Sequence, residues 1–469
     1  MTNALSATST LCRVAYAGAV VAALFGANGI CPGSARAQSI TDAMVMAYQN
    51  NPNILSQRAQ LRSQDEQVNQ ALSGWRPTVT VNSQAGRSYI NTRTVSGGPF
   101  VSSTQWPREA TLTVTQNLYT GGRTEAQTRV ADFNVLTQRA QLDVVEQATL
   151  HAAATSYNDV VLAQAVLVLD INNEQVLARQ LEATRDRFTV GEVTRTDVSQ
   201  AEAALSAAKA AREAAANQLQ ITRAAYRTTV GETPGELKDP GEAKGLPETR
   251  DESISLAQNQ NPNVLVAVYT ERSAIANVDV QFGGLLPQLS LQGTLTKSAN
   301  VSSPVDNTDV AQILAVLSVP IYTGGLVESQ VRAAKQVVGQ RRLELEQAQR
   351  SSIQFATTAW ESLQSARAQA LSFEDQIKAN SVALEGVQQE AQAGLRTVLD
   401  ILNAQQALLQ SQVSLAQAHH DTITAGYDLL QAVGHLSARD RQLPVEFYEP
   451  TVHYEEVREK WFGVGGPVQ

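Results

Sequence analysis

Polar and apolar residues alternate along four short stretches of the chain, as they do along a β-strand that has one face on water. These stretches are residues 78–81, 111–114, 288–292 and 313–319. The segments between the members of each pair, Asn91 to Pro107 and residues 298–309, are rich in small and turn-forming residues. We expect both segments to be loops.

Two much longer stretches follow the strands and have the periodicity of helices. Between residues 327 and 387, apolar or small residues occupy most positions that recur in steps of four and three, which favours coiled-coil packing. We expect long helices over residues 122–188 and 325–391. Each is roughly 100 Å long at a rise of 1.5 Å per residue.

Shorter helices complete the predicted elements. Each long helix ends near a glycine, Gly191 or Gly394, where we expect the chain to reverse into helices over residues 195–230 and 397–433. Ahead of the strands we expect helices over residues 40–74 and 250–284. Four helix starts carry a capping box, in which side-chain oxygens accept from N–H groups of the first turn. The pairs are Ser39 and Asp42, Thr194 and Asp197, Thr249 and Glu252, and Thr397 and Asp400.

The same order of elements occurs twice, which identifies an internal duplication. The turn Asn51-Pro52-Asn53 returns as Asn261-Pro262-Asn263, 210 residues later. The junction Tyr119-Thr120-Gly121-Gly122 returns as Tyr322-Thr323-Gly324-Gly325, 203 residues later. The offset changes only between Pro77 and Tyr119, so the first half has seven extra residues there, which we place in a loop.

The N-terminal segment has the features of an export signal. An apolar run from Val14 to Phe25 follows Arg13, and Ala35-Arg36-Ala37 matches a cleavage site. The run is too short to span a bilayer, which needs about 20 residues. Both cysteines, Cys12 and Cys31, lie in the segment that would be removed, so we expect no disulfide in the mature chain.

We divide the chain into five parts on these patterns. They are a removed signal peptide (1–37), a first repeat (38–235), a linker (236–250), a second repeat (251–435), and a C-terminal tail (436–469) that we expect to pack on the equatorial region of the body.

Charge and motif content exclude several functions. The full chain carries −9 and the signal holds two arginines and no acid, so the mature chain carries −9 − 2 = −11 and is poorly suited to nucleic acid. No histidine has a metal-ligand spacing; His419 and His420 are neighbours on a helix and do not face each other. We expect no enzyme activity, no cofactor and no metal site.

The strands decide how such a chain would meet a membrane. We find no apolar run of spanning length after the signal, so a membrane location requires a β-barrel, which satisfies its own backbone in lipid. Four strands per chain cannot close a barrel, because bacterial barrels have at least about eight. Three copies would supply twelve in a closed cyclic assembly.

This duplicated order of elements resembles the TolC family of outer membrane efflux channels over nearly all of residues 40–435. The segment from Tyr448 to Tyr454 is also similar to the alphaproteobacterial branch. The resemblance implies a mainly α fold with a small β part. It implies a homotrimer with a twelve-stranded barrel in the outer membrane and a long α-helical tunnel in the periplasm. Implied partners are a periplasmic adaptor and an inner-membrane ABC or proton-driven transporter.

The resemblance also implies roles for residues at the helical tips. Asp400 matches an aspartate that forms a ring around the threefold axis, and Asn403 stands where a second ring acid would fall. Arg396 and Asp197 match positions that form polar links holding the tunnel closed. The turns at Gly191, Thr194, Gly394 and Thr397 match the tips that meet the adaptor. Both aspartates are also explained by their capping boxes alone.

The implied function is a passive duct for type I protein secretion, multidrug efflux or both. The strand–helix junctions, marked by Tyr119, Gly121 and Gly122 and by Tyr322, Gly324 and Gly325, would lie where an aromatic girdle meets the membrane interface. The alternative is a periplasmic coiled-coil spacer without a pore. Such a spacer has no need of two alternating strand pairs at matching places.

Overall fold

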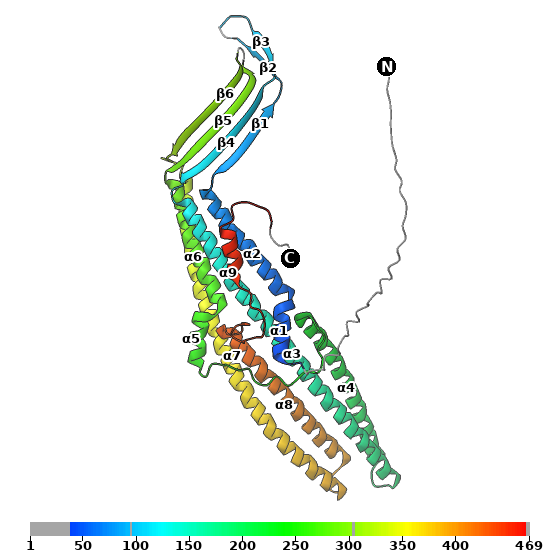
Figure 1. Ribbon diagram of the computed structural model, residues 1–469. Helices are drawn as coiled ribbons and strands as arrows, with labels where there is room; N and C mark the ends of the chain where they lie inside the picture. Colours follow the sequence, from blue (N-terminus) through cyan, green and yellow to red (C-terminus); the bar gives the residue numbers. More distant parts are fainter. Residues whose placement is uncertain (1–37, 94–95, 303–304, 466–469) are drawn as a thin grey trace, which may run out of the picture.

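Residues 38–93, 96–302 and 305–465 are described by a computed structural model, in which a β-sheet stands at one end of a long helical body (Figure 1). The predicted signal peptide, its cleavage site and both cysteines lie outside these residues. The helices of the first repeat are α1 (Ile40–Asn50), α2 (Pro52–Leu72), α3 (Arg123–Thr189) and α4 (Arg195–Val230). Those of the second are α5 (Arg250–Gln260), α6 (Pro262–Phe282), α7 (Leu326–Gln392) and α8 (Val398–Val433), and α9 (Pro450–Arg458) follows.

The main sheet joins the two repeats. Its strands are β1 (Thr78–Ala85), β4 (Arg108–Tyr119), β5 (Gln288–Ser302) and β6 (Val305–Ser318), in the order β1-β4-β5-β6. Every neighbouring pair is antiparallel. The central β4–β5 pairing therefore connects the first repeat to the second, and β1 and β6 are the outer strands of the sheet.

Both segments that we expected to be loops contain strand. In the first, β2 (Ser88–Thr92) pairs with β3 (Val101–Gln105) in a separate two-stranded sheet. In the second, β5 and β6 continue pairing out to Ser302 and Val305. These strands are rich in Ser, Thr and Asn, so their sequence resembles that of a loop. They still form because antiparallel pairing satisfies the backbone hydrogen bonds whatever the polarity of the side chains. The seven extra residues of the first repeat fall in this region.

The helices predicted over 40–74 and 250–284 are each divided in two. Asn51 caps α2 by accepting from the N–H of Asn53 at 2.9 Å, and Asn261 caps α6 by accepting from Asn263 at the same distance. The prolines that follow have no N–H with which to continue the preceding helix. Each repeat therefore bends at its Asn-Pro step.

The predicted long helices agree with the structure to within one residue at each end. Reciprocal capping boxes form at Ser39, Thr194 and Thr397. At Thr249 only half of the box forms, because the Glu252 carboxylate accepts from the N–H of Glu248 at 3.0 Å instead of from the cap.

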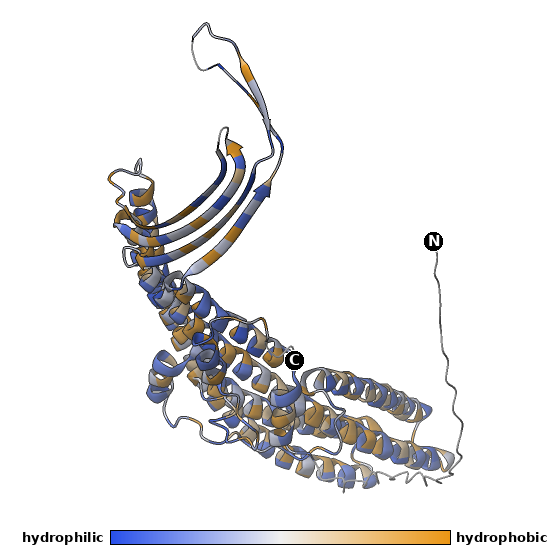
Figure 2. Ribbon diagram, turned by 45° about the horizontal axis from the view of Figure 1, so that its top comes forward, coloured by the Kyte–Doolittle hydropathy of each residue, from blue (hydrophilic) through white to orange (hydrophobic). Residues whose placement is uncertain are grey.

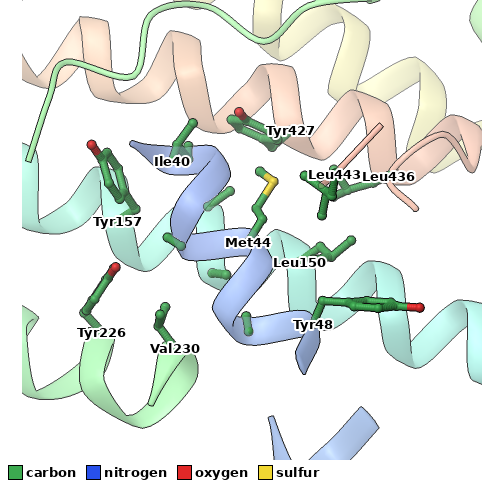
Figure 3. Close-up of a cluster of buried hydrophobic side chains, with 14 of the residues drawn as sticks. Ile40, Met44, Tyr48, Leu150, Tyr157, Tyr226, Val230, Tyr427, Leu436 and Leu443 are labelled. Carbon is green, nitrogen blue, oxygen red and sulfur yellow. The ribbon is translucent and has the colours of Figure 1, made fainter. Parts of the chain in front are cut away.

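The main core lies in the middle of the body, where α1, α3, α4 and α8 meet (Figure 3). Met44, Leu150 and Tyr226 are almost completely buried there. The hydroxyl oxygen of Tyr157 lies 2.7 Å from the carbonyl oxygens of Gln38 and Lys238, so this core also fixes the start of the described chain and the linker.

One expectation about membrane-spanning segments is wrong. Helix α3 contains a run that is long and apolar enough to cross a membrane by length and composition. The buried helix of a soluble core meets the same criteria, and α3 supplies Leu150, Tyr157 and Val160 to the core. The run therefore reflects packing within the body, and it is weak evidence for a span.

The C-terminal segment packs along α2 and α3 (Figure 1). His453 on α9 lies 2.9 Å from the buried carboxylate of Asp65, and the Tyr454 hydroxyl donates to Asp132 at 2.8 Å. The guanidinium of Arg58 lies between the rings of Tyr48 and Tyr448, at 4.6 and 5.0 Å.

Candidate functional site

Two turns close the helical hairpins at the end of the body farthest from the sheet (Figure 1). Gly191 between α3 and α4 has φ 83°, and Gly394 between α7 and α8 has φ 78°. The N–H groups of the next residues, Glu192 and Leu395, reach back to the carbonyls of Arg187 and Glu390 at 2.9 Å. This is the pattern of a Schellman turn, in which glycine adopts the left-handed conformation at low cost.

The two aspartates predicted for the tips are both held by their own helix starts. Asp197 accepts from the N–H and hydroxyl of Thr194 at 2.8 and 2.7 Å. Asp400 accepts from the same groups of Thr397, both at 2.9 Å. These hydrogen bonds, with the backbone one first, lower the pKa of Asp400 below its ordinary value. Both carboxylates are therefore held in place by the first turns of their own helices.

Arg396 forms its ion pair within its own turn. Its Nε donates to Glu390 Oε2 at 2.8 Å, and this bond raises the pKa of Arg396. Asp197 belongs to the other hairpin, and no contact joins it to Arg396 within one chain. The structure thus brings Arg396 close to Asp400 and Glu390, and it does not bring it to Asp197. Asn403 is exposed, one turn beyond Asp400 on α8.

The sequence analysis did not identify the ion pair of Glu390 with Arg396, or the equivalent ion pair of the first hairpin. Arg187 Nε donates to Glu192 Oε2 at 3.0 Å, so the last turn of α3 carries the cation and the turn carries the acid. In the second hairpin the order of charges is reversed. The 203-residue offset makes Arg187 the counterpart of Glu390. This change of charge between equivalent positions is the sequence signal that points to the two ion pairs.

The strand–helix junctions differ in what surrounds them. A Cβ atom on Gly121 would lie 2.6 Å from the carbonyl oxygen of Gly283, so this glycine permits close contact between the two repeats. At the equivalent Gly324, nothing lies within 4 Å. Tyr119 is 45% exposed and Tyr322 is 82% exposed. Gly122 and Gly325 cap α3 and α7 with φ of 75° and 81°.

The main sheet has one apolar and one polar face, visible as alternating bands along the strands (Figure 2). The register places most of the apolar residues of the four strands on one side, whereas Val310, Leu314 and Val316 of β6 lie on the other. They include Val79, Val81, Leu112, Val114, Leu291, Leu295, Ile313, Ala315 and Leu317. The middle of the other side is mostly threonine, asparagine and glutamine, with Thr111 and Thr296 hydroxyls 3.2 Å apart across β4 and β5.

Helix α7 lacks the neighbours that its counterpart α3 has. Helix α3 packs on α6 and α8 of the second repeat and buries more than twice as many residues as α7, at equal length. Leu343 on α7 is 68% exposed, whereas its counterpart Ala140 on α3 is 3% exposed. One face of α7 is therefore apolar and uncovered in a single chain.

Comparisons with known proteins agree with this architecture. A family model described as outer membrane efflux protein matches residues 43–232 and 253–435. The outer membrane efflux protein BepC of Brucella suis biovar 1 (strain 1330) is 36% identical over 96% of this chain and 97% of its own. The outer membrane protein TolC of Vibrio cholerae is 28% identical over 86% and 92%. The crystal structure of the outer membrane protein VceC from Vibrio cholerae superposes with a TM-score of 0.74 at 19% identity, covering 84% of this chain and 96% of that one.

Proposed function

Because the chain belongs to the outer membrane efflux protein family, we propose that three copies close one channel whose helical tips dock onto a periplasmic adaptor and an inner-membrane transporter. The chain is an outer membrane export channel with its helices in the periplasm. It is a passive duct of the type used in type I protein secretion and multidrug efflux. The energy for export comes from the transporter.

The observation that carries the proposal is the four-stranded sheet with two unlike faces. Four strands are too few for a closed barrel, and an open edge in lipid leaves backbone groups without partners. Since the order is β1-β4-β5-β6 and every pairing is antiparallel, β6 of one copy runs antiparallel to β1 of the next. Three copies thus give twelve strands with lipid on the apolar face and water on the polar face.

The duplication supplies the register of the contact between copies. Within the chain, β4 of the first repeat pairs with β5 of the second, and Thr115 lies opposite Gln292. The offset of 203 relates Thr115 to Ser318 on β6, and the offset of 210 relates Gln292 to Asn82 on β1. We therefore place Ser318 opposite Asn82 of the partner subunit. The same relation packs the uncovered face of α7 on α2 and α4 of the next copy.

Cysteine crosslinking tests this register. The chain has no cysteine after residue 31, so the double variant N82C/S318C introduces the only two thiols beyond that segment. Oxidation is expected to give covalent dimers and closed trimers on a non-reducing denaturing gel. The matched control N82C/L314C moves one thiol four residues along the same face of β6, about 13 Å away. Equal crosslinking in both variants, or none in either, would refute the register.

The tips are the proposed gate. In a ring, Asp400 contributes one carboxylate per copy at the end of the tunnel, and Asn403 adds an amide where an acid would have doubled the charge. Arg396 is already paired with Glu390 in a single chain, so the link to Asp197 requires an exchange of partners between hairpins. The turns at Gly191, Thr194, Gly394 and Thr397 form the exposed ends that meet the adaptor.

Conductance across a planar bilayer tests the gate. The variant Arg396→Ser is expected to raise the open-channel current, because it removes a cation that ties the last turns together. Arg342→Ser is the matched control, since this arginine pairs with Glu271 far from the tips, at 3.1 Å. An unchanged current in Arg396→Ser, or an equal gain in the control, would exclude this arginine from the gate.

The alternative of a pore-free periplasmic spacer has less support. A spacer would expose the apolar face of the sheet to water over a large area, which soluble proteins avoid. Membrane fractionation separates the two functions. A trimer recovered in the soluble fraction, without the heat-modifiable gel mobility of a barrel, would favour the spacer.

A further inference from the structure

The two-stranded sheet of β2 and β3 projects beyond the main sheet, at the end farthest from the helical tips (Figure 1). We call the described residues 86–93 and 96–107 the outer hairpin. The base of the hairpin continues from the main sheet, because the N–H of Gly86 donates to the carbonyl of Pro107 at 3.0 Å. Since the helices lie in the periplasm, this hairpin lies at the outer surface of the membrane.

The outer hairpin exposes large aromatic side chains beside arginines. Tyr89, Phe100 and Trp106 are 67%, 58% and 56% exposed. The guanidinium of Arg93 lies 4.0 Å from the ring centroid of Phe100, and that of Arg87 lies 5.7 Å from the ring of Trp106. Aromatic rings with an adjacent cation suit the boundary between lipid and water, where the ring is buried and the charge stays hydrated.

The charge of the outer hairpin is opposite to that of the chain. It carries Arg87 and Arg93 and no aspartate or glutamate, whereas the full chain has a net charge of −9. Neither guanidinium forms an ion pair with a carboxylate of the described residues. At the corresponding end of the second repeat, the first turn-proximal residues of β6 include Asp306 and Asp309. The basic, aromatic surface therefore belongs to the hairpin of the first repeat, which is the longer of the two by seven residues.

We propose that the outer hairpin binds the phosphate groups of anionic lipid headgroups in the outer leaflet. Arginine forms paired, charge-assisted hydrogen bonds with phosphate oxygens, and neither guanidinium is paired with a carboxylate in the part of the chain that the structure describes. The aromatic rings beside them enter the same interface, continuous with the exposed apolar residues Val79 and Val81 of β1. In a ring of three copies, the arginines form three phosphate-binding positions around the channel mouth.

Lipid binding to the purified full-length trimer tests the proposal. Native mass spectrometry counts bound molecules of diphosphorylated lipid A, with fully dephosphorylated lipid A as the probe that lacks only the phosphates. The variant R87Q/R93Q is expected to lower the apparent affinity for the diphosphorylated form by about tenfold or more, as loss of two lipid-facing cations implies. The control R341Q/R350Q removes two arginines from exposed ion pairs on α7 and is expected to bind as the wild type does.

Several outcomes would overturn the proposal. They are equal binding of the two lipids by the wild type, unchanged binding by R87Q/R93Q, and an equal loss in R341Q/R350Q. A salt titration of the wild type needs no variant: binding through phosphates weakens from 50 to 500 mM NaCl, and salt-independent binding would refute it. If the hairpin instead contacts a protein at the cell surface, the lipid count stays the same in every variant.

Discussion

The contact between the two strand–helix junctions can be tested with glycine substitutions that differ in one respect. Gly121 and Gly122 both have positive φ, 66° and 75°, so alanine at either position costs about 1–2 kcal/mol of backbone strain. Only at Gly121 would the added Cβ meet other atoms, the carbonyl oxygen of Gly283 at 2.6 Å and the Cβ of Leu286 at 2.8 Å. Overpacking of this kind costs about 1–3 kcal/mol more.

Thermal unfolding of the detergent-purified trimer measures the difference. At about 2.1 cal/mol/K of unfolding entropy per residue, a chain of this length loses about 1 °C of midpoint temperature per kcal/mol. Gly121→Ala is therefore expected to unfold about 1–3 °C below Gly122→Ala, as followed by the loss of helical circular dichroism. Identical midpoints for the two variants would show that the two repeats do not meet rigidly at this point.

The second repeat extends the same experiment to the contact between copies. Gly324 has φ 67°, and within one chain nothing lies within 4 Å of its added Cβ. In the proposed ring, the duplication places it against Ser73 of the partner subunit, as Gly121 is placed against Gly283. Gly324→Ala is then expected to resemble Gly121→Ala. If it resembles Gly122→Ala instead, the copies do not meet in the way that the repeats do.

Two further predictions concern contacts within the helical body. Burial lowers the pKa of His420, but its hydrogen bonds to Asp159 at 2.8 Å and Asp421 at 3.0 Å outweigh burial and raise it. The charged form of His420 therefore stabilises the fold below about pH 6.5, and this contribution is lost as the pH rises through the raised pKa. The thermal midpoint of His420→Gln is expected to fall less than that of the wild type between pH 6 and pH 8.5. An equal fall in both proteins would contradict this. Asn261→Ala removes the cap of α6 and leaves the buried carbonyl of Ala432 without its donor at 2.8 Å. The expected loss of unfolding free energy is about 2–4 kcal/mol. A thermal midpoint within about 1 °C of the wild type would contradict this prediction.

Most of the helical architecture follows from local patterns in the sequence. The long helices end where glycine and a capping box coincide, at Gly191 and Gly394, because these signals act within a single turn of helix. The Asn-Pro steps can be recognised in the sequence, but the break that they make in each predicted helix cannot. Asn51 and Asn261 each donate to a carbonyl that is distant in the sequence, and only the folded chain supplies this partner.

The outer hairpin and the ion pairs at the tips were beyond such reasoning. The strands of the outer hairpin carry apolar residues on both faces, since Tyr89 and Ile90 are neighbours on β2, so no alternation of polar and apolar residues marks them. Arg396 was assigned to Asp197 by resemblance, whereas the nearest carboxylate in the folded chain is that of Glu390, six residues earlier across the turn. Which charges pair depends on turn geometry, and that geometry is not encoded in spacing alone.

The reversed ion pairs at the two tips have a consequence for stoichiometry. One hairpin presents an arginine on its long helix and the other a glutamate at the same place, so a periplasmic protein that recognises one tip by charge meets the opposite sign on the next. A ring of three copies then offers two alternating kinds of landing position. Partners could occupy three sites of one kind, or six sites in two non-identical poses, and the sequence difference between the tips is what would let a partner tell them apart.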